Sequence, residues 1–137
     1  MTPIATAPVF LAARVLLALM FILAGFAKLG GLEGTADYIA SAGLPLPGVL
    51  AVATGLLEVI GGIALAIGFR ARLAALVLAL FTLLATFLFH DFWAVPADQA
   101  YVQQLMFMKN LAVAGGLLFV FASGTGAVSV DARRAAA

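Results

Sequence analysis

The segment from Ala51 to Gly68 constrains the fold most, because it is long and apolar yet carries a carboxylate at Glu58. A helix of about 20 mostly apolar residues is long enough to cross a bilayer. A charged side chain near the bilayer centre costs roughly 2.5–3.5 kcal/mol on insertion scales, so it is rarely left without a partner. The segment therefore predicts a membrane-spanning helix whose Glu58 faces a basic or hydrogen-bonding group on another helix.

Composition extends this expectation to the whole chain. Hydrophobic residues make up 66% of it and charged residues 9%, against about 25% charged residues in soluble domains. We expect an all-α polytopic membrane protein embedded in the lipid bilayer, with residues 1–137 forming one four-transmembrane-helix bundle. The spans are expected at about residues 8–29, 48–69, 72–93 and 104–122. A short interfacial helix is expected in the first outer loop, and the tail is expected to be frayed and solvated.

The same counts limit the chemistry of the chain. A net charge of +1 argues against a nucleic-acid partner. The absence of cysteine excludes dithiol, iron–sulfur and zinc-finger chemistry from this chain, and a single histidine cannot supply both axial ligands of a haem. We therefore expect no metal site and no intrinsic cofactor.

Two spans have small and polar residues on one face. In the first span, Arg14 and Lys28 are fourteen residues apart, close to four helical turns, and share a stripe with Ala18, Phe21 and Gly25. In the third span the stripe consists of Ala75, Ala79, Thr82, Thr86, His90 and Trp93. Such stripes usually face neighbouring helices rather than lipid.

The positions of lysine and arginine predict the orientation. Loops 30–47 and 94–103 contain neither residue, whereas the short middle turn contains Arg70 and Arg72 and the tail contains Arg133 and Arg134. By the positive-inside rule, we expect both termini in the cytoplasm and both of these loops outside. Arg70 and Arg72 then set the orientation, and Arg14 has a structural role in the inner third of the bilayer.

Helical rise predicts which charges meet. Counted from the outer span ends, Lys28 and His90 lie within roughly 5 Å of the boundary, Lys109 about 8–10 Å deep and Glu58 about 15 Å deep. Lys109 is thus the cation nearest to Glu58 in depth. We expect a Glu58–Lys109 pair, bordered by Asn110 and His90, in a polar cleft that opens outward.

These residues are also the candidates for function. If the protein is catalytic, Glu58, Lys109 and His90 are the candidate catalytic residues. The candidate ligand-binding residues are Lys28, Glu58, His90, Trp93, Lys109 and Asn110. Each also has a structural interpretation, because Glu58–Lys109 can fix helix register, Lys28 can reach the headgroups, and Trp93 can anchor the chain at the interface.

Five motifs resemble one known family, the DoxX family of small four-span bacterial membrane proteins. They are FILAGFAKLGG (21–31), GLPLP (43–47), LLEVIGGIALAIGFRAR (56–72), LFHDFWA (88–94) and KNLAVAGGLL (109–118). The family's name comes from a subunit of a terminal quinol oxidase, and the related DoxD proteins belong to a thiosulfate:quinone oxidoreductase. The resemblance implies redox or quinone-linked work at the inner membrane.

Three functions follow as hypotheses. The chain interacts with a quinone or quinol, or it is a non-catalytic accessory subunit of a membrane redox complex. Alternatively, it is a transporter or exporter of a small solute or of protons, which with four spans requires a homo-oligomer. An enzymatic role would be that of a quinone-linked oxidoreductase component without its own metal or flavin, so electrons would come from a partner subunit.

Overall fold

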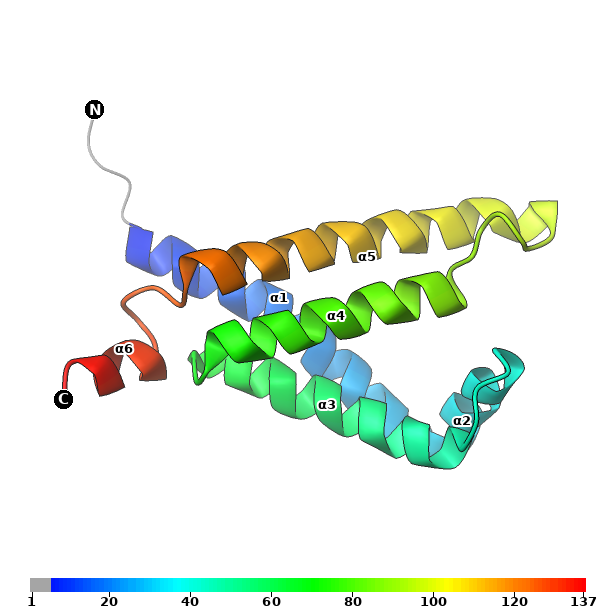
Figure 1. Ribbon diagram of the computed structural model, residues 1–137, viewed down its shortest axis with the longest axis horizontal. Helices are drawn as coiled ribbons and strands as arrows, with labels where there is room; N and C mark the ends of the chain where they lie inside the picture. The colour runs from blue at the N-terminus through cyan, green and yellow to red at the C-terminus, as the bar shows by residue number, and fades with distance from the viewer. Residues whose placement is uncertain (1–5) are drawn as a thin grey trace.

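Four long helices make up most of the protein, for which the computed structural model describes residues 6–137. The helices long and apolar enough to cross a membrane are α1 (Thr6–Gly30), α3 (Pro47–Ile67), α4 (Ala71–Phe89) and α5 (Ala97–Ser123). Two short helices are α2 (Leu32–Ser41), after α1, and α6 (Val130–Ala135), after α5 (Figure 1). The described residues contain no strand, so the all-α fold with four candidate spans is confirmed. Helix α2 lies in the loop where an interfacial helix was expected, and its place at a membrane surface stays a prediction.

Glycine and proline set most helix boundaries. Helix α3 ends at Gly68, whose φ of 72° suits glycine, and the Phe69 N–H donates to the Ala64 carbonyl at 2.9 Å. Helix α5 begins directly after Pro96, well before the expected start near residue 104. The expected start was too late because it was taken from the apolar run, whereas the polar residues before that run are also helical. Conversely, α4 ends at Phe89, short of the expected boundary near residue 93.

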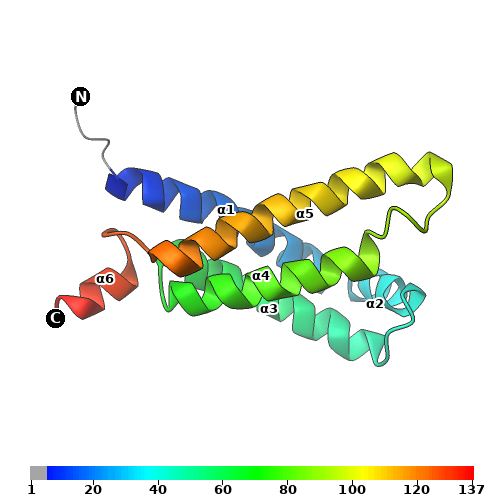
Figure 2. The ribbon, with the colours of Figure 1, turned by 45° about the horizontal axis from the view of Figure 1, so that its top comes forward.

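The long helices pack mainly as two antiparallel pairs, α1 with α3 and α4 with α5 (Figure 1). The pairs are joined by the α3–α4 turn near the end that carries both termini, and they separate toward the opposite end (Figure 2). Helices α1 and α3 approach most closely at Gly25. A Cβ atom on Gly25 would lie 2.7 Å from the Gly55 carbonyl oxygen and 2.8 Å from the Val59 backbone nitrogen. Only glycine permits this approach.

The small and polar stripes expected from the sequence lie inside the protein. Arg14, Ala18, Phe21 and Gly25 are the buried residues of α1. On α4 the stripe is buried from Ala75 to Thr86, and the hydroxyls of Thr82 and Thr86 donate to carbonyls one turn earlier in the helix. Large apolar side chains on the opposite faces remain exposed, as lipid contact requires; examples are Leu16, Leu84 and Phe119.

The C-terminal tail is packed against the bundle, so the expectation that it is frayed was wrong. Arg14 is 2% exposed, and its guanidinium donates to carbonyl oxygens of the tail at Thr125 and Val128 and of α3 at Ala66. In the tail, the Asp131 carboxylate accepts the backbone N–H groups of Arg70 at 2.7 Å and Ala71 at 3.0 Å. These contacts satisfy otherwise unpaired groups at helix ends, which stabilises the tail in place.

We expect Asp131→Ala to lower the free energy of unfolding by about 1–2 kcal/mol, because the first N–H groups of α4 lose their acceptor. Denaturant unfolding of the purified protein in detergent micelles measures this change. Arg133→Ala is the matched control, because Arg133 is an exposed residue of the same short helix. Equal stability losses in the two variants would contradict the capping role of Asp131.

Candidate functional site

A cavity of about 260 Å³ lies between the two helix pairs. Its lining comes from all five helices before the tail, and its apolar walls include Phe21, Phe81 and Phe89. The polar lining residues are Lys28, Thr35, Tyr38, Thr54, Glu58, Thr82, His90, Lys109 and Asn110. The cavity therefore combines aromatic walls with several hydrogen-bonding groups.

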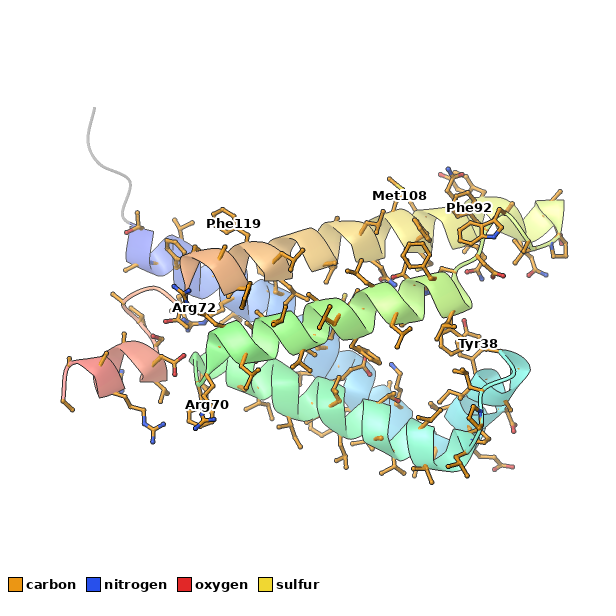
Figure 3. The ribbon with its side chains drawn as sticks, viewed as in Figure 1. Tyr38, Arg70, Arg72, Phe92, Met108 and Phe119 are labelled. Atoms are coloured by element: carbon orange, nitrogen blue, oxygen red, sulfur yellow. The ribbon has the colours of Figure 1, made fainter. Side chains whose placement is uncertain are left out.

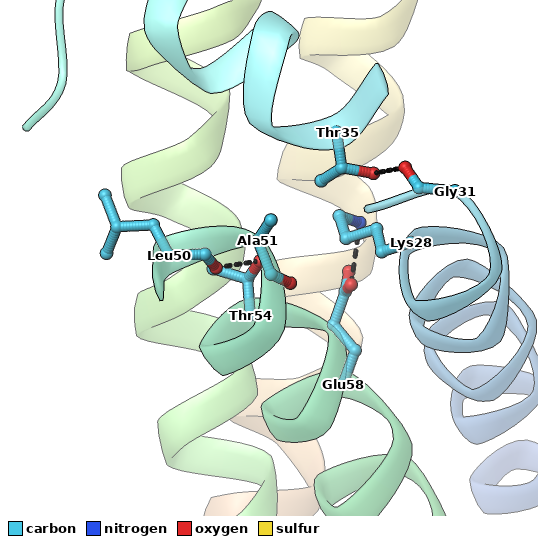
Figure 4. A network of polar contacts seen from close by, with 7 residues as sticks. All are labelled: Lys28, Gly31, Thr35, Leu50, Ala51, Thr54 and Glu58. Atoms are coloured by element: carbon cyan, nitrogen blue, oxygen red, sulfur yellow. Dashed lines mark hydrogen bonds and ion pairs between the residues drawn. The ribbon is translucent and has the colours of Figure 1, made fainter. Parts of the chain in front are cut away.

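An ion pair between α1 and α3 is the main polar feature of this cavity. The Lys28 ammonium lies 2.6 Å from Glu58 Oε2, and the two side chains are 31% and 6% exposed (Figure 4). A carboxylate this deeply buried requires an opposite charge or hydrogen-bond donors. Lys28 supplies the charge, and its partial exposure places the pair at the edge of the cavity.

The predicted Glu58–Lys109 pair was therefore wrong. The exposed Lys109 ammonium lies 3.5 Å from Met106 Sδ, one turn away on the same helix, although Lys109 does line the cavity. The depth estimate failed because α1 and α3 do not end at the same level. A Cβ atom on Gly55 would lie 2.8 Å from Leu29 Cδ2, so the last turn of α1 lies beside Gly55. The first turns of α3 extend beyond α1 and pack against α2, which brings Lys28 within about one turn of Glu58.

Helix α2 brings a tyrosine to the cavity. The Tyr38 ring stacks on Phe89 of α4 with a centroid distance of 4.9 Å, so α2 and α4 meet across this side of the cavity (Figure 3). Partial burial, and then the negative charge of Asp91, raise the pKa of the Tyr38 phenol above its usual value. The hydroxyl therefore keeps its proton at neutral pH and remains a hydrogen-bond donor.

The other polar groups differ in their freedom to bind a ligand. His90 Nδ1 lies 2.8 Å from Gln103 Oε1 of α5, which orients the imidazole ring. The hydroxyls of Thr35 and Thr54 donate to carbonyls of their own helices, at Gly31 and Leu50 respectively (Figure 4). Their oxygens retain acceptor capacity only.

Five of the six predicted ligand-binding residues line this cavity, namely Lys28, Glu58, His90, Lys109 and Asn110. The sixth, Trp93, is 59% exposed and is not part of the lining. Its indole packs edge-to-face against Phe92 and Phe107, beyond the end of α4 (Figure 3). Trp93 lies in the turn after α4, which ends at Phe89, so the helical periodicity that placed it on the stripe does not apply to it.

Sequence reasoning missed Thr35, Tyr38 and Thr54. Thr54 precedes Glu58 by four residues, and this spacing on a helix would have placed it on the same face. Tyr38 lies on the short helix α2. Only the packing of α2 brings its ring to the cavity, and the sequence alone carries no signal for that packing.

Within residues 6–137 no three His, Cys, Asp or Glu side chains gather as a metal site would require. The lining of the described cavity offers aromatic surfaces and hydrogen-bonding groups. Tyr38 and Lys28 are donors, and the Asn110 amide can donate and accept. Glu58 is positioned to accept a proton.

We expect Lys28→Met to lower the free energy of unfolding by about 2–3 kcal/mol, because it leaves Glu58 buried without its partner. The partial exposure of Lys28 keeps this below the roughly 3–5 kcal/mol for breaking a fully buried pair. Adding Glu58→Gln to Lys28→Met should restore part of the loss. Lys109→Met is the control and should change stability by less than about 0.5 kcal/mol. Unfolding in micelles tests the set, and a larger loss for Lys109→Met would restore the rejected pairing.

Comparison with known proteins identifies relatives of this chain. The DoxX family profile matches residues 9–91. The chain is 44% identical over 121 residues to inner membrane protein YqjF of Escherichia coli, an alignment covering 88% of each chain. It is 35% identical to inner membrane protein YphA of the same organism, with 90% of this chain and 88% of that protein aligned.

A more distant match is the Surfeit locus protein 4 homolog of Schizosaccharomyces pombe, at 37% identity over 70 residues, which cover 50% of this chain and 23% of that protein. No solved structure shows a significant match to this chain. The family profile covers more than half of the chain, and the two bacterial relatives align with nearly all of it. With four helices apolar enough to cross a bilayer, the protein is a multi-pass protein of the inner membrane, as its bacterial relatives are. By the family profile and these relatives, it belongs to the DoxX family.

Proposed function

We propose that the cavity binds the polar ring of a quinone or quinol, and that the protein is a quinone-interacting or accessory subunit of a membrane redox system. The observation that carries this proposal is the Lys28–Glu58 pair at the edge of a cavity with aromatic walls. A volume of about 260 Å³ is slightly below the roughly 300–1,000 Å³ typical of small-molecule pockets, so the cavity suits a small ring. The cavity admits a substituted ring, and an isoprenoid tail would leave between the separated helix pairs toward lipid.

The residues present suit such a ring. Phe21, Phe81 and Phe89 offer apolar contact to its faces. Tyr38 and Asn110 are placed to donate hydrogen bonds to carbonyl oxygens. A bound quinone supplies reversible two-electron, two-proton chemistry. Glu58 next to Lys28 can hold or pass a proton, and electrons would come from a partner subunit.

The distribution of arginines supports an outward-facing cavity. Arg70, Arg72, Arg133 and Arg134 all lie in the α3–α4 turn, the first turn of α4 and helix α6, at the end opposite the cavity. By the positive-inside rule this end is cytoplasmic. Both termini would then lie in the cytoplasm and the cavity in the outer leaflet.

A small-solute or proton transporter is the alternative function. It requires a path from the cavity to the cytoplasmic end. In this conformation buried side chains that include Ala18, Leu65, Leu78 and Leu117 fill the space between the helices. Transport would need these helices to move apart, and nothing else in the structure favours it over quinone binding.

We expect a short-chain quinone analogue to bind the detergent-solubilised protein, with affinity measured by isothermal titration calorimetry. Asn110→Leu and Tyr38→Phe should each weaken binding by about fivefold to tenfold, because each variant lacks one hydrogen-bond donor to a quinone carbonyl. Trp93→Phe is the control, because Trp93 lies outside the cavity lining, and its affinity should match the wild type. Unchanged binding in both cavity variants would reject the site. Proton or solute flux in liposomes that Glu58→Gln abolishes would favour the transporter instead.

A further inference from the structure

A second hollow, of about 640 Å³, lies at the opposite end of the protein from the quinone cavity. It is formed where the start of α4, the end of α5 and helix α6 meet. Arg70 and Arg72 line it, together with Leu73 and residues of the tail that include Ser123, Thr125 and Asp131. Figure 3 shows both arginine side chains at this end of the molecule.

The hollow has an excess of positive charge. Arg70 and Arg72 are exposed, and within residues 6–137 neither forms an ion pair. Asp131 is the carboxylate in the lining, but both of its oxygens accept backbone N–H groups at the start of α4. The Arg72 guanidinium lies over the end of α5, where a Cβ atom on Gly124 would be 3.2 Å from Nη2. The two guanidinium groups therefore remain free to bind an anion.

The position of the hollow points to a lipid rather than a soluble anion. Helix α4 has 19 residues and is about 28 Å long, close to the roughly 30 Å thickness of the hydrocarbon core. Its first turn, with Arg72, thus lies near headgroup level when the helix spans the bilayer. Below the hollow, the exposed apolar residues Leu73, Val77, Leu80 and Leu84 form a stripe along α4. An acyl chain can lie along this stripe while its phosphate occupies the hollow.

We infer that Arg70 and Arg72 form a binding site for an anionic phospholipid, with the phosphate in the hollow and an acyl chain along α4. Guanidinium groups suit this ligand because their planar donors match phosphate oxygens and can bind them in a bidentate manner. The site is separate from the cavity at the other end. It does not depend on what that cavity binds.

Native mass spectrometry of the detergent-solubilised protein, titrated with phosphatidylglycerol or phosphatidylcholine, tests the site. We expect a single phosphatidylglycerol to bind in preference to phosphatidylcholine. The double variant Arg70→Gln/Arg72→Gln should weaken phosphatidylglycerol binding by about fivefold or more, given the attraction of each surface arginine for anionic lipid. Arg70→Lys/Arg72→Lys should retain part of the affinity, which shows that the arginine positions accept substitution without loss of the fold.

The control is Arg133→Gln/Arg134→Gln, which removes the same charge from the same end of the protein but outside the hollow. Its affinity for phosphatidylglycerol should stay close to that of the wild type. Equal losses of phosphatidylglycerol affinity in the two glutamine variants would contradict the proposed site and indicate general electrostatic attraction. Equal binding of phosphatidylglycerol and phosphatidylcholine would also contradict the proposed site. Displacement of the lipid by millimolar inorganic phosphate would contradict it too, because it would indicate a site for a soluble anion.

Discussion

Charged side chains inside a bilayer need partners on neighbouring helices. In this protein, most of the charged side chains with such partners belong to helix α1. Helix α1 carries Arg14 and Lys28 on the same face, Arg14 about two turns after its start and Lys28 in its last turn. Lys28 pairs with Glu58 of α3, whereas Arg14 donates to carbonyls of α3 and of the C-terminal tail. Between them, Gly25 lets α1 and α3 come into backbone contact. These three contacts hold α1 and α3 together.

The two ends of the protein differ as a result. At the end with the termini, Arg14 and Asp131 connect α1, α3, α4 and the tail through hydrogen bonds to backbone groups. At the opposite end, α1 and α3 hold each other through the ion pair, and α4 and α5 separate from them. The cavity lies on this side, between the two helix pairs. We see this division between a fixed end and an open end as the main feature that relates the fold to its proposed function.

The sequence predicted which helix faces are buried better than it predicted how the helices are shifted along the bundle axis relative to one another. The stripe of Arg14, Ala18, Phe21 and Gly25 follows from helical periodicity, and all four residues are buried. The partner of Glu58 could not be found in the same way. Depth was counted from the outer ends of the spans, on the assumption that all these ends lie at the same depth in the bilayer. In the structure, α3 begins beyond the end of α1, beside α2.

The tail was misjudged for a related reason. Residues 124–137 are polar and rich in small side chains, a composition typical of a loose end. Asp131 nevertheless accepts hydrogen bonds from Arg70 and Ala71, about sixty positions earlier in the chain. Such long-range contacts depend on the packing of all the helices, and local sequence patterns do not encode them.

The fourteen-residue interval between Arg14 and Lys28 has a consequence for how this chain can vary. Each residue added to a helix turns everything beyond it by about 100°. A one-residue insertion between the two cations would therefore rotate one of them away from its partners, whatever residue was inserted. If Arg14 kept its contacts, an insertion between Arg14 and Gly25 would also move Gly25 off the contact with Gly55, so that a side chain met backbone there. This half of α1 should accept changes of side chain far more readily than any change of length.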